Sequence, residues 1–532
     1  MKNIIKYISF GVLCGLVTAC TPNYEYINQN HAGVTEEQAE ADGYNITTSL
    51  ITLQNNVIST STSRAQYVDL LLGGTWGRYA AESKANSWPN KFSTFDPPAD
   101  WSGVEFNEVI PYIFPYVSSI ERVTDDVVPQ AIAHIIKVAA MHRVTDTYGP
   151  IPYTQVGVDG QVQTAYDSQE QVYKAMFVEL NQAITELTDH QTESISQNAD
   201  LIFKGDLLKW IRFANSLKLR LAIRTCYVPQ FNVDGKTSQQ LAEEAVNHSV
   251  GVMTSNDDVA RLTTFSNVGN PLNEAIKFNE GDHRAIADMT IYMNAYNDPR
   301  RAAYFNESGY SSQTYCGLRT GLAPIGSSDF NKFSTIKIER ETPLVWMYPS
   351  EVMFLCAEGA LRGWNMGGGT AQSYYEQGIK LSFEYWGVSD DNYIHSTKAP
   401  DTYSDPSGKN SYSNKVSNIT VQWNNGGVFE ENLERIIVQK WIAIFPLGVE
   451  AWSEHRRTGY PKLLPVPTDK SGGSVNVEQG ARRLPYPVEE YQQNNANLQA
   501  AIQTLGAEQQ NGDRSGDVMG TRVWWDCKPY NK

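Results

Sequence analysis

Cysteine is scarce in this sequence, with six residues in 532, and no two of them form a Cys-X-X-Cys pair. No histidine lies at metal-ligand spacing from a cysteine, so the pattern excludes the common zinc and redox motifs, and we expect no cofactor. Cys226 and Cys356 lie in apolar helical patterns and are predicted to be buried thiols. Cys316 and Cys527 could form a disulfide outside the cytoplasm, and the sequence leaves that question open.

Positive charge is also in deficit. The chain carries 43 Lys and Arg against 59 Asp and Glu, which gives a formal net charge of −16. This balance argues against binding to nucleic acid or to an anionic surface. Long apolar runs are absent after residue 19, so we expect residues 21–532 to form a body without a transmembrane helix.

The single long apolar run lies at the start of the chain. A basic opening, "MKNIIK", precedes an apolar stretch of signal-peptide length at Tyr7–Ala19. The run ends in "VTAC", which resembles a bacterial lipobox and places Cys20 where the lipid is attached. We therefore expect a signal peptide at 1–19 and a lipidated tether at 20–33, held at a membrane by its acyl chains. The alternative is an ordinary signal peptide with an incidental cysteine.

Aromatic residues are abundant, whereas charged residues are few. The chain has 29 Tyr and 12 Trp, whereas charged residues make up only 19%. Aromatic rings and amide side chains on a surface suit the binding of neutral carbohydrate, because rings stack on sugars and amides bond their hydroxyls. The alternative for any single ring is a place in the core.

Amphipathic helical patterns dominate the chain. "DSQEQVYKAMFVELNQAITEL" places its apolar residues on one stripe and begins with a capping box from Ser168 to Gln171. In the helix before it, we expect Pro129 at the first position. Two later patterns, "YPSEVMFLCAEGALRGW" and "TAQSYYEQGIKLSFEYWG", flank a glycine-rich turn at Gly367–Gly369 and predict a helix hairpin. Such hairpins stack like tetratricopeptide repeats, although no strict period is visible.

The sequence therefore predicts a mostly α fold in a single body over 34–532. Helical hairpins are expected mainly over four ranges: 34–60, 106–260, 343–390 and 430–460. Segments with loop composition lie between the helices, and ordered loops of this length are usually functional. These segments are 76–102, 267–334 and 390–427, and the first two are predicted to hold the ligand.

Several stretches, in the expected order, resemble the SusD/RagB family of surface lipoproteins from bacterial nutrient-uptake systems. They are "VTDTYGPIPYTQ" (Val144–Gln155), "YDSQEQVYKAMFVELNQAI", "KWIRFANSLKLRLAIR", "YNDPRRAAYF" (Tyr296–Phe305), "YPSEVMFLCAEGALRGW" and "QKWIAIFPLGVEAWSEHRRTGYP" (Gln439–Pro461). The resemblance implies a right-handed scaffold of four tetratricopeptide-like hairpins with an irregular, loop-rich, ligand-binding subdomain beside it. It also implies a lid on a SusC-like TonB-dependent transporter of the outer membrane, which captures an oligosaccharide or a peptide at the cell surface.

Candidate ligand-binding side chains lie in the two loop regions. Trp88 stands in the turn-like "NSWPN" and could be a flat platform for a sugar ring or part of the core. Trp76 and Tyr79 are further candidates, although their positions favour the core. Tyr310 and Tyr315 flank a polar stretch in the second loop region and could stack on a ligand in the same way.

Two polar side chains complete the candidate site. Arg319 could bond sugar hydroxyls, or it could clamp its loop to a carboxylate. His283 could contact the ligand, with a surface histidine at a helix start as the alternative. Other conspicuous residues are assigned to structure rather than to ligand binding. They are Trp101, Trp210, Trp441, Trp452, Arg456 and Arg457. Glu450 or Glu454 is expected to pair with an arginine.

Three functions are weighed. A neutral glycan such as a β-glucan or xyloglucan is favoured as the ligand by the aromatic, amide-rich loops and the acidic net charge. The first alternative is the lid of a peptide transporter. The second is a surface glycoside hydrolase, but no motif selects one pair of carboxylates, and no HExxH or GxSxG pattern is present. A structural Ca²⁺ could bind the oxygen-rich Ser255–Leu262, although the ligand spacing of a calcium loop is absent.

Overall fold

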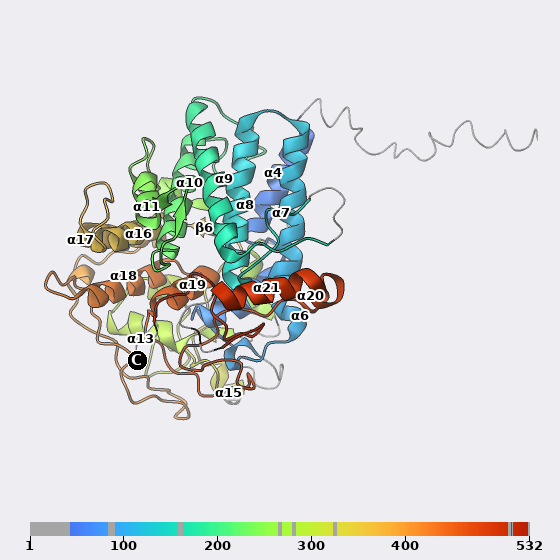
Figure 1. Ribbon diagram of the computed structural model, residues 1–532. Helices are drawn as coiled ribbons and strands as arrows, with labels where there is room; N and C mark the ends of the chain where they lie inside the picture. The colour runs from blue at the N-terminus through green and yellow to red at the C-terminus, as the bar shows by residue number, and fades with distance from the viewer. Residues whose placement is uncertain are drawn as a thin grey trace, which may run out of the picture.

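Helices make up most of the chain in the computed structural model (Figure 1). The structure describes residues 43–82, 91–157, 163–263, 269–278, 283–322, 327–508, 512 and 514–529. Among the described residues, no helix is both long and apolar enough to cross a bilayer.

Six helices of the first half stand side by side, each against its neighbour in the chain (Figure 1). They are α4 (Tyr44–Val57), α7 (Val104–Val123), α8 (Val127–Tyr148), α9 (Gln169–Asp189), α10 (Leu207–Arg224) and α11 (Ser238–Val246). The capping box that begins α9 is present, with Ser168 and Gln171 bonded reciprocally. The predicted start at Pro129 is wrong: α8 begins two residues earlier, because the Asp126 side chain accepts a hydrogen bond from the backbone N–H of Val128 (3.0 Å).

Four further helices belong to the second half of the chain. They are α16 (Pro349–Leu361), α17 (Ala371–Trp386), α18 (Phe429–Ala443) and α19 (Gly448–Thr458). Helix α16 packs against both α17 and α18, whereas α19 packs against α8 and the earlier segment η1 (Gln66–Gly74). The predicted hairpin over 343–390 is confirmed, and its turn uses Gly367 and Gly368 at φ of 80° and 94°, where a side chain would be strained. At Gly448, α19 passes so close to an earlier segment that a Cβ would lie 2.2 Å from the carbonyl carbon of Gly73.

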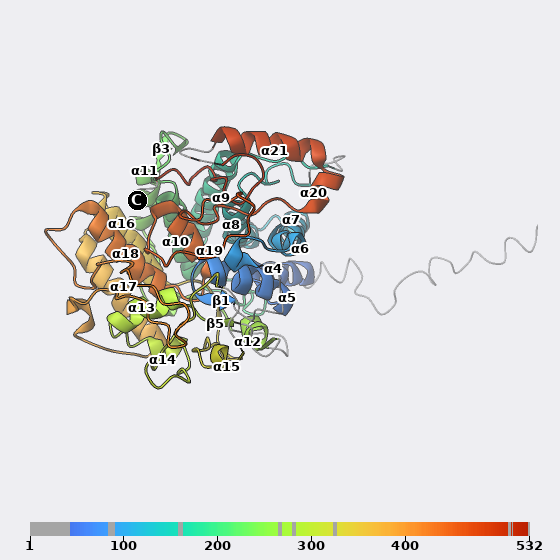
Figure 2. The same ribbon diagram turned by 90° about the horizontal axis from the view of Figure 1, so that it is seen from below.

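Most of the remaining elements are short. The helical ones are α5 (Thr62–Ala65), the π-helical η1 (Gln66–Gly74), η2 (Phe92–Thr94), α6 (Ala99–Ser102), η3 (Asn256–Asp258), α12 (Pro271–Lys277), α13 (Ala287–Ala295), α14 (Arg301–Tyr304), α15 (Ser327–Phe330), η5 (Tyr393–His395), α20 (Val488–Gln493) and α21 (Asn495–Glu508). Four of them fall in 267–334, which the sequence predicted as loop, and α12, α14 and α15 lie on the side away from α21 (Figure 2). These helices escape a search for periodicity because they span only four to nine residues.

Three two-stranded antiparallel sheets are present among the described residues, of which two connect distant parts of the chain and one is a local hairpin. Their strands are β1 (Ala80–Glu82) with β5 (His283–Ala285), β2 (Asn232–Val233) with β3 (Lys236–Thr237), and β4 (Ala260–Leu262) with β6 (Leu344–Met347). In the first sheet Glu82 pairs with His283, so the two predicted ligand-binding regions are joined there.

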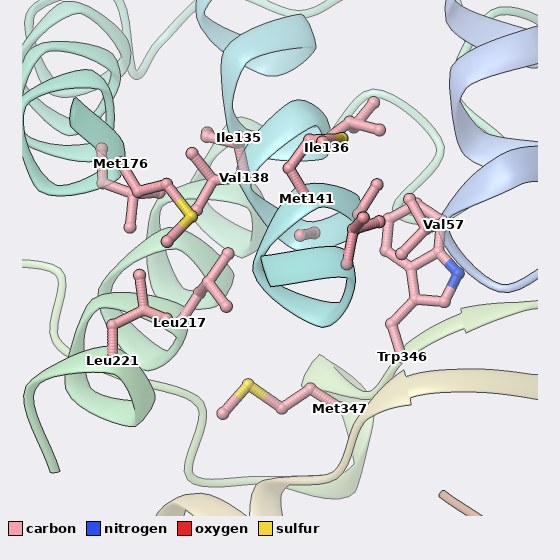
Figure 3. Close-up of a cluster of buried hydrophobic side chains, with 14 of the residues drawn as sticks. Val57, Ile135, Ile136, Val138, Met141, Met176, Leu217, Leu221, Trp346 and Met347 are labelled. Atoms are coloured by element: carbon pink, nitrogen blue, oxygen red, sulfur yellow. The ribbon is translucent and has the colours of Figure 1, made fainter. Parts of the chain in front are cut away.

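Two apolar cores lie under these elements. The first fills the space between the helices α4 to α11 and includes Ile135, Met176 and Leu217 from three of these helices, together with Trp346 of β6 (Figure 3). The second lies between α13, α16, α17 and α18 and contains Trp441. Trp210 is fully buried in the first core, as predicted.

A buried ion-pair network connects helices of both cores. We use this name for Arg220, Arg224, Glu351, Glu358, Lys440, Glu450, Glu454 and Arg457. Arg224 contacts Glu450 (2.6 Å) and also Glu454. Arg457 contacts both Glu454 (2.7 Å) and Glu358 (2.6 Å). The structural role predicted for Arg457 and the pairing of Glu450 and Glu454 with arginines are therefore confirmed.

The four cysteines of the described chain are free thiols. Cys316 is buried in the second core, while Cys527 donates to the carbonyl of Trp524 (3.0 Å), a residue of the first core. The disulfide that the sequence left open between them is absent. Cys356 is buried as predicted, and burial raises its pKa to about 12, whereas Cys226 is only half-buried.

Candidate functional site

Two of the predicted platforms are core residues. Trp76 is 6% exposed, donates its indole N–H to the carbonyl of Phe92 (3.0 Å) and packs on Trp452 with ring centroids 4.8 Å apart. Tyr79 is 2% exposed and donates its hydroxyl to the carbonyl of Trp441 (2.6 Å). Their assignment as ligand platforms is therefore wrong, because returning segments cover both rings. Trp88 lies outside the described residues.

His283 is also in the interior. It lies on strand β5 and not at a helix start, and its side chain is buried. Burial, reinforced by the charges of Lys91 and Arg284, lowers the pKa of His283 to about 3, so the imidazole is neutral. The histidine supports the sheet and offers no surface to a ligand.

The second loop region keeps its predicted residues near the surface. Tyr310 is half-buried, packs against Phe333 and donates its hydroxyl to the carbonyl of Asp329 (2.9 Å). Arg319 donates to the carbonyl of Pro465 (2.8 Å) and lies over the ring of Tyr412. Arg319 thus clamps its loop, but to a backbone carbonyl rather than to the expected carboxylate. Tyr315 is the residue of this set that borders an open hollow.

That hollow, which we call the Tyr315 hollow, has a volume of about 620 Å³. It lies between α13, the start of α14 and two loops, and its lining is rich in amides and hydroxyls. The residues that line it are Thr290, Ile291, Asn294, Ala295, Asn297, Arg301, Gln313, Thr314, Tyr315, Asp401, Thr402, Tyr403 and Ser404. The volume falls in the range of sites for small organic ligands.

The polar groups of one wall are fixed by one another. Arg301 donates to the amide oxygens of Asn294 (3.2 Å) and Asn297, and its guanidinium lies 5.6 Å from the ring centroid of Tyr315. Asn294 in turn donates to the backbone carbonyl of Tyr315 (2.8 Å). Asn297 has a φ of 53°, a left-handed conformation that asparagine tolerates better than most residues. Burial lowers the pKa of Arg301, but the side chain stays charged because its pKa starts far above neutrality.

The turn beneath this wall is rigid. Asp298 and Arg300 are fully buried and form a bidentate ion pair, with Nε to Oδ1 at 2.9 Å and Nη2 to Oδ2 at 2.5 Å. Tyr393 also donates to Asp298 (2.7 Å). A buried, fully bonded turn of this kind holds Asn297 and Arg301 in place before any ligand arrives.

The opposite wall comes from a distant loop. Gln313 donates to the carbonyl of Ser404 (2.9 Å), and Tyr403 donates to the carbonyl of Gly317 (2.9 Å). Asp401 is exposed at this edge. The sequence indicated Tyr315 alone from this lining. The signal that could have revealed the turn is "YNDPR", since Asn-Asp-Pro marks a tight turn.

The arrangement suits binding better than hydrolysis. Amide, guanidinium and hydroxyl groups surround one tyrosine ring, and Asp401 is the one carboxylate among the described residues that line the hollow. A glycosidase of the common type needs two facing carboxylates. In the part of the chain that the structure describes, no group of three acidic, histidine or cysteine side chains could hold a metal ion. In the predicted calcium segment, Asp258 is instead bonded by Arg212 (3.1 Å).

Comparison with protein families identifies the chain. A model named SusD-like, described as the Susd and RagB outer membrane lipoprotein, matches residues 26–526. The chain belongs to the SusD-like family. The sequence-based expectation of this family and of its mostly α fold is confirmed. A search of curated proteins gives no match.

Solved structures of SusD homologues share this fold. A SusD homologue from Bacteroides uniformis is 45% identical, with a TM-score of 0.85, over 92% of this chain and all of that chain. One from Bacteroides ovatus is 43% identical, with the same score and coverage. A chitin-binding SusD homologue from Flavobacterium johnsoniae is 38% identical, with a TM-score of 0.84, over 91% of this chain and 99% of that one.

Proposed function

We propose that this SusD-like chain captures a neutral glycan in the Tyr315 hollow and serves as the lid of a SusC-like TonB-dependent transporter. In this proposal Cys20 carries the lipid and holds the protein at the outer membrane. The family description as an outer membrane lipoprotein supports the anchor, and the family match begins at residue 26, shortly after Cys20.

The main support for a glycan as the ligand is the chemistry of the residues that line the Tyr315 hollow. A sugar presents an apolar ring face and a set of hydroxyls, and the hollow offers Tyr315 for the first and fixed amides for the second. The lining has one charged group of each sign, Arg301 and Asp401, so it favours a ligand without net charge. Trp88, from the first of the two loop regions predicted to hold the ligand, is proposed as an additional platform.

Chitin oligosaccharides are the first ligand to test. The relative described as chitin-binding is 38% identical to this chain over almost its whole length. Chitin is neutral, and its acetamido groups can exchange hydrogen bonds with Asn294 and Gln313. The β-glucan and xyloglucan expected from the sequence are the next probes. We expect micromolar to millimolar affinity, because a flexible chain must be ordered on few contacts and then released.

Isothermal titration calorimetry of residues 21–532 with chitin hexaose, a xyloglucan oligosaccharide and a mixed peptide pool tests the proposal. We expect binding of one glycan, weakened about five- to thirty-fold in Tyr315→Ala, because a stacked ring contributes about 1–2 kcal/mol. Tyr112→Ala is the matched control, since that ring is 40% exposed on α7, outside the hollow. Trp88→Ala measures the second platform.

The outcomes separate the alternatives. Glycan binding that Tyr315→Ala leaves unchanged would move the site away from this hollow. Binding of peptides alone would replace the glycan lid by a peptide lid. Release of reducing ends from a bound glycan would indicate a hydrolase. Co-purification of a SusC-like transporter with the tagged lipoprotein tests the lid role separately.

A further inference from the structure

A second hollow, of about 270 Å³, lies at the C-terminal end of α19 and is lined by basic side chains. We call it the cationic hollow, and it shares no residue with the Tyr315 hollow. Its charged and titratable lining consists of Glu430, His455, Arg456, Tyr460, Lys462, Arg482, Arg522 and Lys528. This is an unusual concentration of positive charge for a chain with a net charge of −16.

The carboxylates around this hollow do not match its cations. Lys528 pairs with Glu430 (2.7 Å), while Arg482 (2.5 Å) and Arg522 (3.1 Å) share the single carboxylate of Asp526. Two carboxylates are thus divided among three cations, and two further cations line the same space. A cleft lined by charge of one sign attracts a counter-ion of the other.

Arg456 is one of the two further cations. It is 2% exposed, and within the described ranges no carboxylate lies within 4.0 Å of it. Its Nη1 donates to the backbone carbonyls of Asp146 (2.6 Å) and Arg482 (2.7 Å), and its Nε has no acceptor among the described residues. A buried guanidinium without a counter-ion is costly. Burial lowers the pKa of Arg456 to about 9, even though Asp146 and Asp526 attract the charge.

Lys462 is the second of the two further cations that line the cationic hollow, and its ammonium can reach a ligand that enters. It is half-buried, and its ammonium lies 5.1 Å from the ring centroid of Tyr460. Among the residues described, no carboxylate lies within 4.0 Å of this ammonium, although burial raises the pKa of the more distant Glu434 and the charge of Lys462 lowers it. Beside it, burial together with the charges of Arg482, Arg78 and Lys462 lowers the pKa of His455 to about 3. His455 and Lys462 also line a neighbouring hollow of about 440 Å³, which supplies a route of entry.

We propose that the cationic hollow binds a small oxyanion: a carboxylate, sulfate or phosphate group, either free or carried by a single sugar. Guanidinium and ammonium donors bond such groups strongly. The volume of about 270 Å³ is enough for a small ion or a monosaccharide. The inference does not depend on the neutral-glycan site, because it concerns different residues and a ligand of the opposite character.

The test is calorimetry of residues 21–532 with sodium sulfate, sodium phosphate, glucuronate and, as the neutral control, glucose, all at one ionic strength set with chloride. We expect at least one anion to bind and glucose not to. Lys462→Gln should weaken binding about ten- to a hundred-fold, the range for losing a charge-assisted hydrogen bond. Lys462→Arg should retain most of it.

Lys380→Gln is the matched control, since that side chain is 76% exposed on α17, outside the hollow. Binding of sulfate or phosphate but not glucuronate assigns the site to a free ion, whereas tighter binding of glucuronate than of sulfate assigns it to a sugar acid. The proposal is overturned if no anion binds, or if Lys462→Gln and Lys380→Gln reduce binding equally. Neither outcome bears on the glycan titration, so the two proposals fail independently.

Discussion

The ion-pair network and the Tyr315 hollow both organise arginines, yet they hold them with different partners. In the network Arg224 is fully buried and contacts Glu450 and Glu454. In the hollow Arg301 is half-buried and bonds amide oxygens and a backbone carbonyl. Carboxylates neutralise a buried charge and fix helices together. Amides position a guanidinium and leave a polar, nearly neutral surface that an incoming ligand can share.

The largest effect is expected where the network is broken. Glu454→Ala removes the shared partner of Arg224, Lys440 and Arg457 and leaves the four buried cations of the network with three carboxylates. We expect the free energy of unfolding to fall by about 3–5 kcal/mol, measured by urea denaturation. Glu384→Ala, at a 50% exposed side chain on α17, should change it by less than about 0.5 kcal/mol. A loss below about 1 kcal/mol in Glu454→Ala would show that the network is not what joins these helices.

The network and the β1–β5 sheet should respond oppositely to pH. Burial alone would raise the pKa of Glu358, but Arg457 and Arg362 outweigh it and lower the pKa to about 2. Its contribution to stability is present above about pH 4.5, the ordinary value, and is lost as the pH falls towards 2. At Glu82 burial dominates, against a hydrogen bond from Ser93, and raises the pKa to about 7. The stability due to protonated Glu82 is therefore present below about pH 4.5 and lost as the pH rises through 7.

Glu82→Gln tests this contrast, because glutamine cannot ionise and can still accept from Ser93. We expect the variant to be more stable than the wild type at pH 8.5, by up to about 3 kcal/mol, and within about 1 kcal/mol of it at pH 5. Glu307→Gln, at an exposed position, should show no such trend. Equal differences at both pH values would mean that Glu82 is ionised throughout.

Substitutions in the Tyr315 hollow should lower the affinity for the ligand more than the stability of the fold. This prediction rests on the proposed glycan function. Arg301→Ala should weaken chitin hexaose binding about five- to tenfold, through the loss of about 1–1.4 kcal/mol, because one charged donor is removed. The free energy of unfolding should change by less than about 1 kcal/mol, since Arg301 is half-buried and pairs only with neutral groups. Arg122→Ala, at an exposed arginine of α7, is the control. A large loss of stability with no loss of affinity would make Arg301 a structural residue.

The same comparison explains what the sequence could and could not predict. Helix α9 and the hairpin of α16 and α17 depend on neighbours three or four residues apart, which a periodicity captures. The burial of Tyr79 depends on Trp441, 362 positions away, and no local pattern encodes that contact. The sequence favoured the core for Trp76 and Tyr79, but it could not exclude them as ligand platforms, because the segments that cover their rings are distant in the chain.

The Tyr315 hollow is a second example of contacts between distant segments that no local sequence pattern predicts. Its walls come from α13, from the loop around Gln313 and from a loop near Asp401, and only the fold brings them together. The composition predicted a site of aromatic rings and amides, and residues of these types line the hollow in which a glycan is proposed to bind. The turn at Asn297 could be suspected from Asn-Asp-Pro, but its partners could not.

The smallest effect is expected when the protein is treated with a reductant. A disulfide between Cys316 and Cys527 would have linked the loops of the second core to the C-terminal segment. Cys316 and Cys527 are both buried free thiols, and burial first of all raises the pKa of each to about 12. Dithiothreitol should therefore leave the Tm of residues 21–532 unchanged, and a thiol titration after unfolding without reductant should find the four thiols of Cys226, Cys316, Cys356 and Cys527. A count of two, with a lower Tm in reductant, would show a disulfide and hence a covalent link between regions that are joined by non-covalent contacts in the structure.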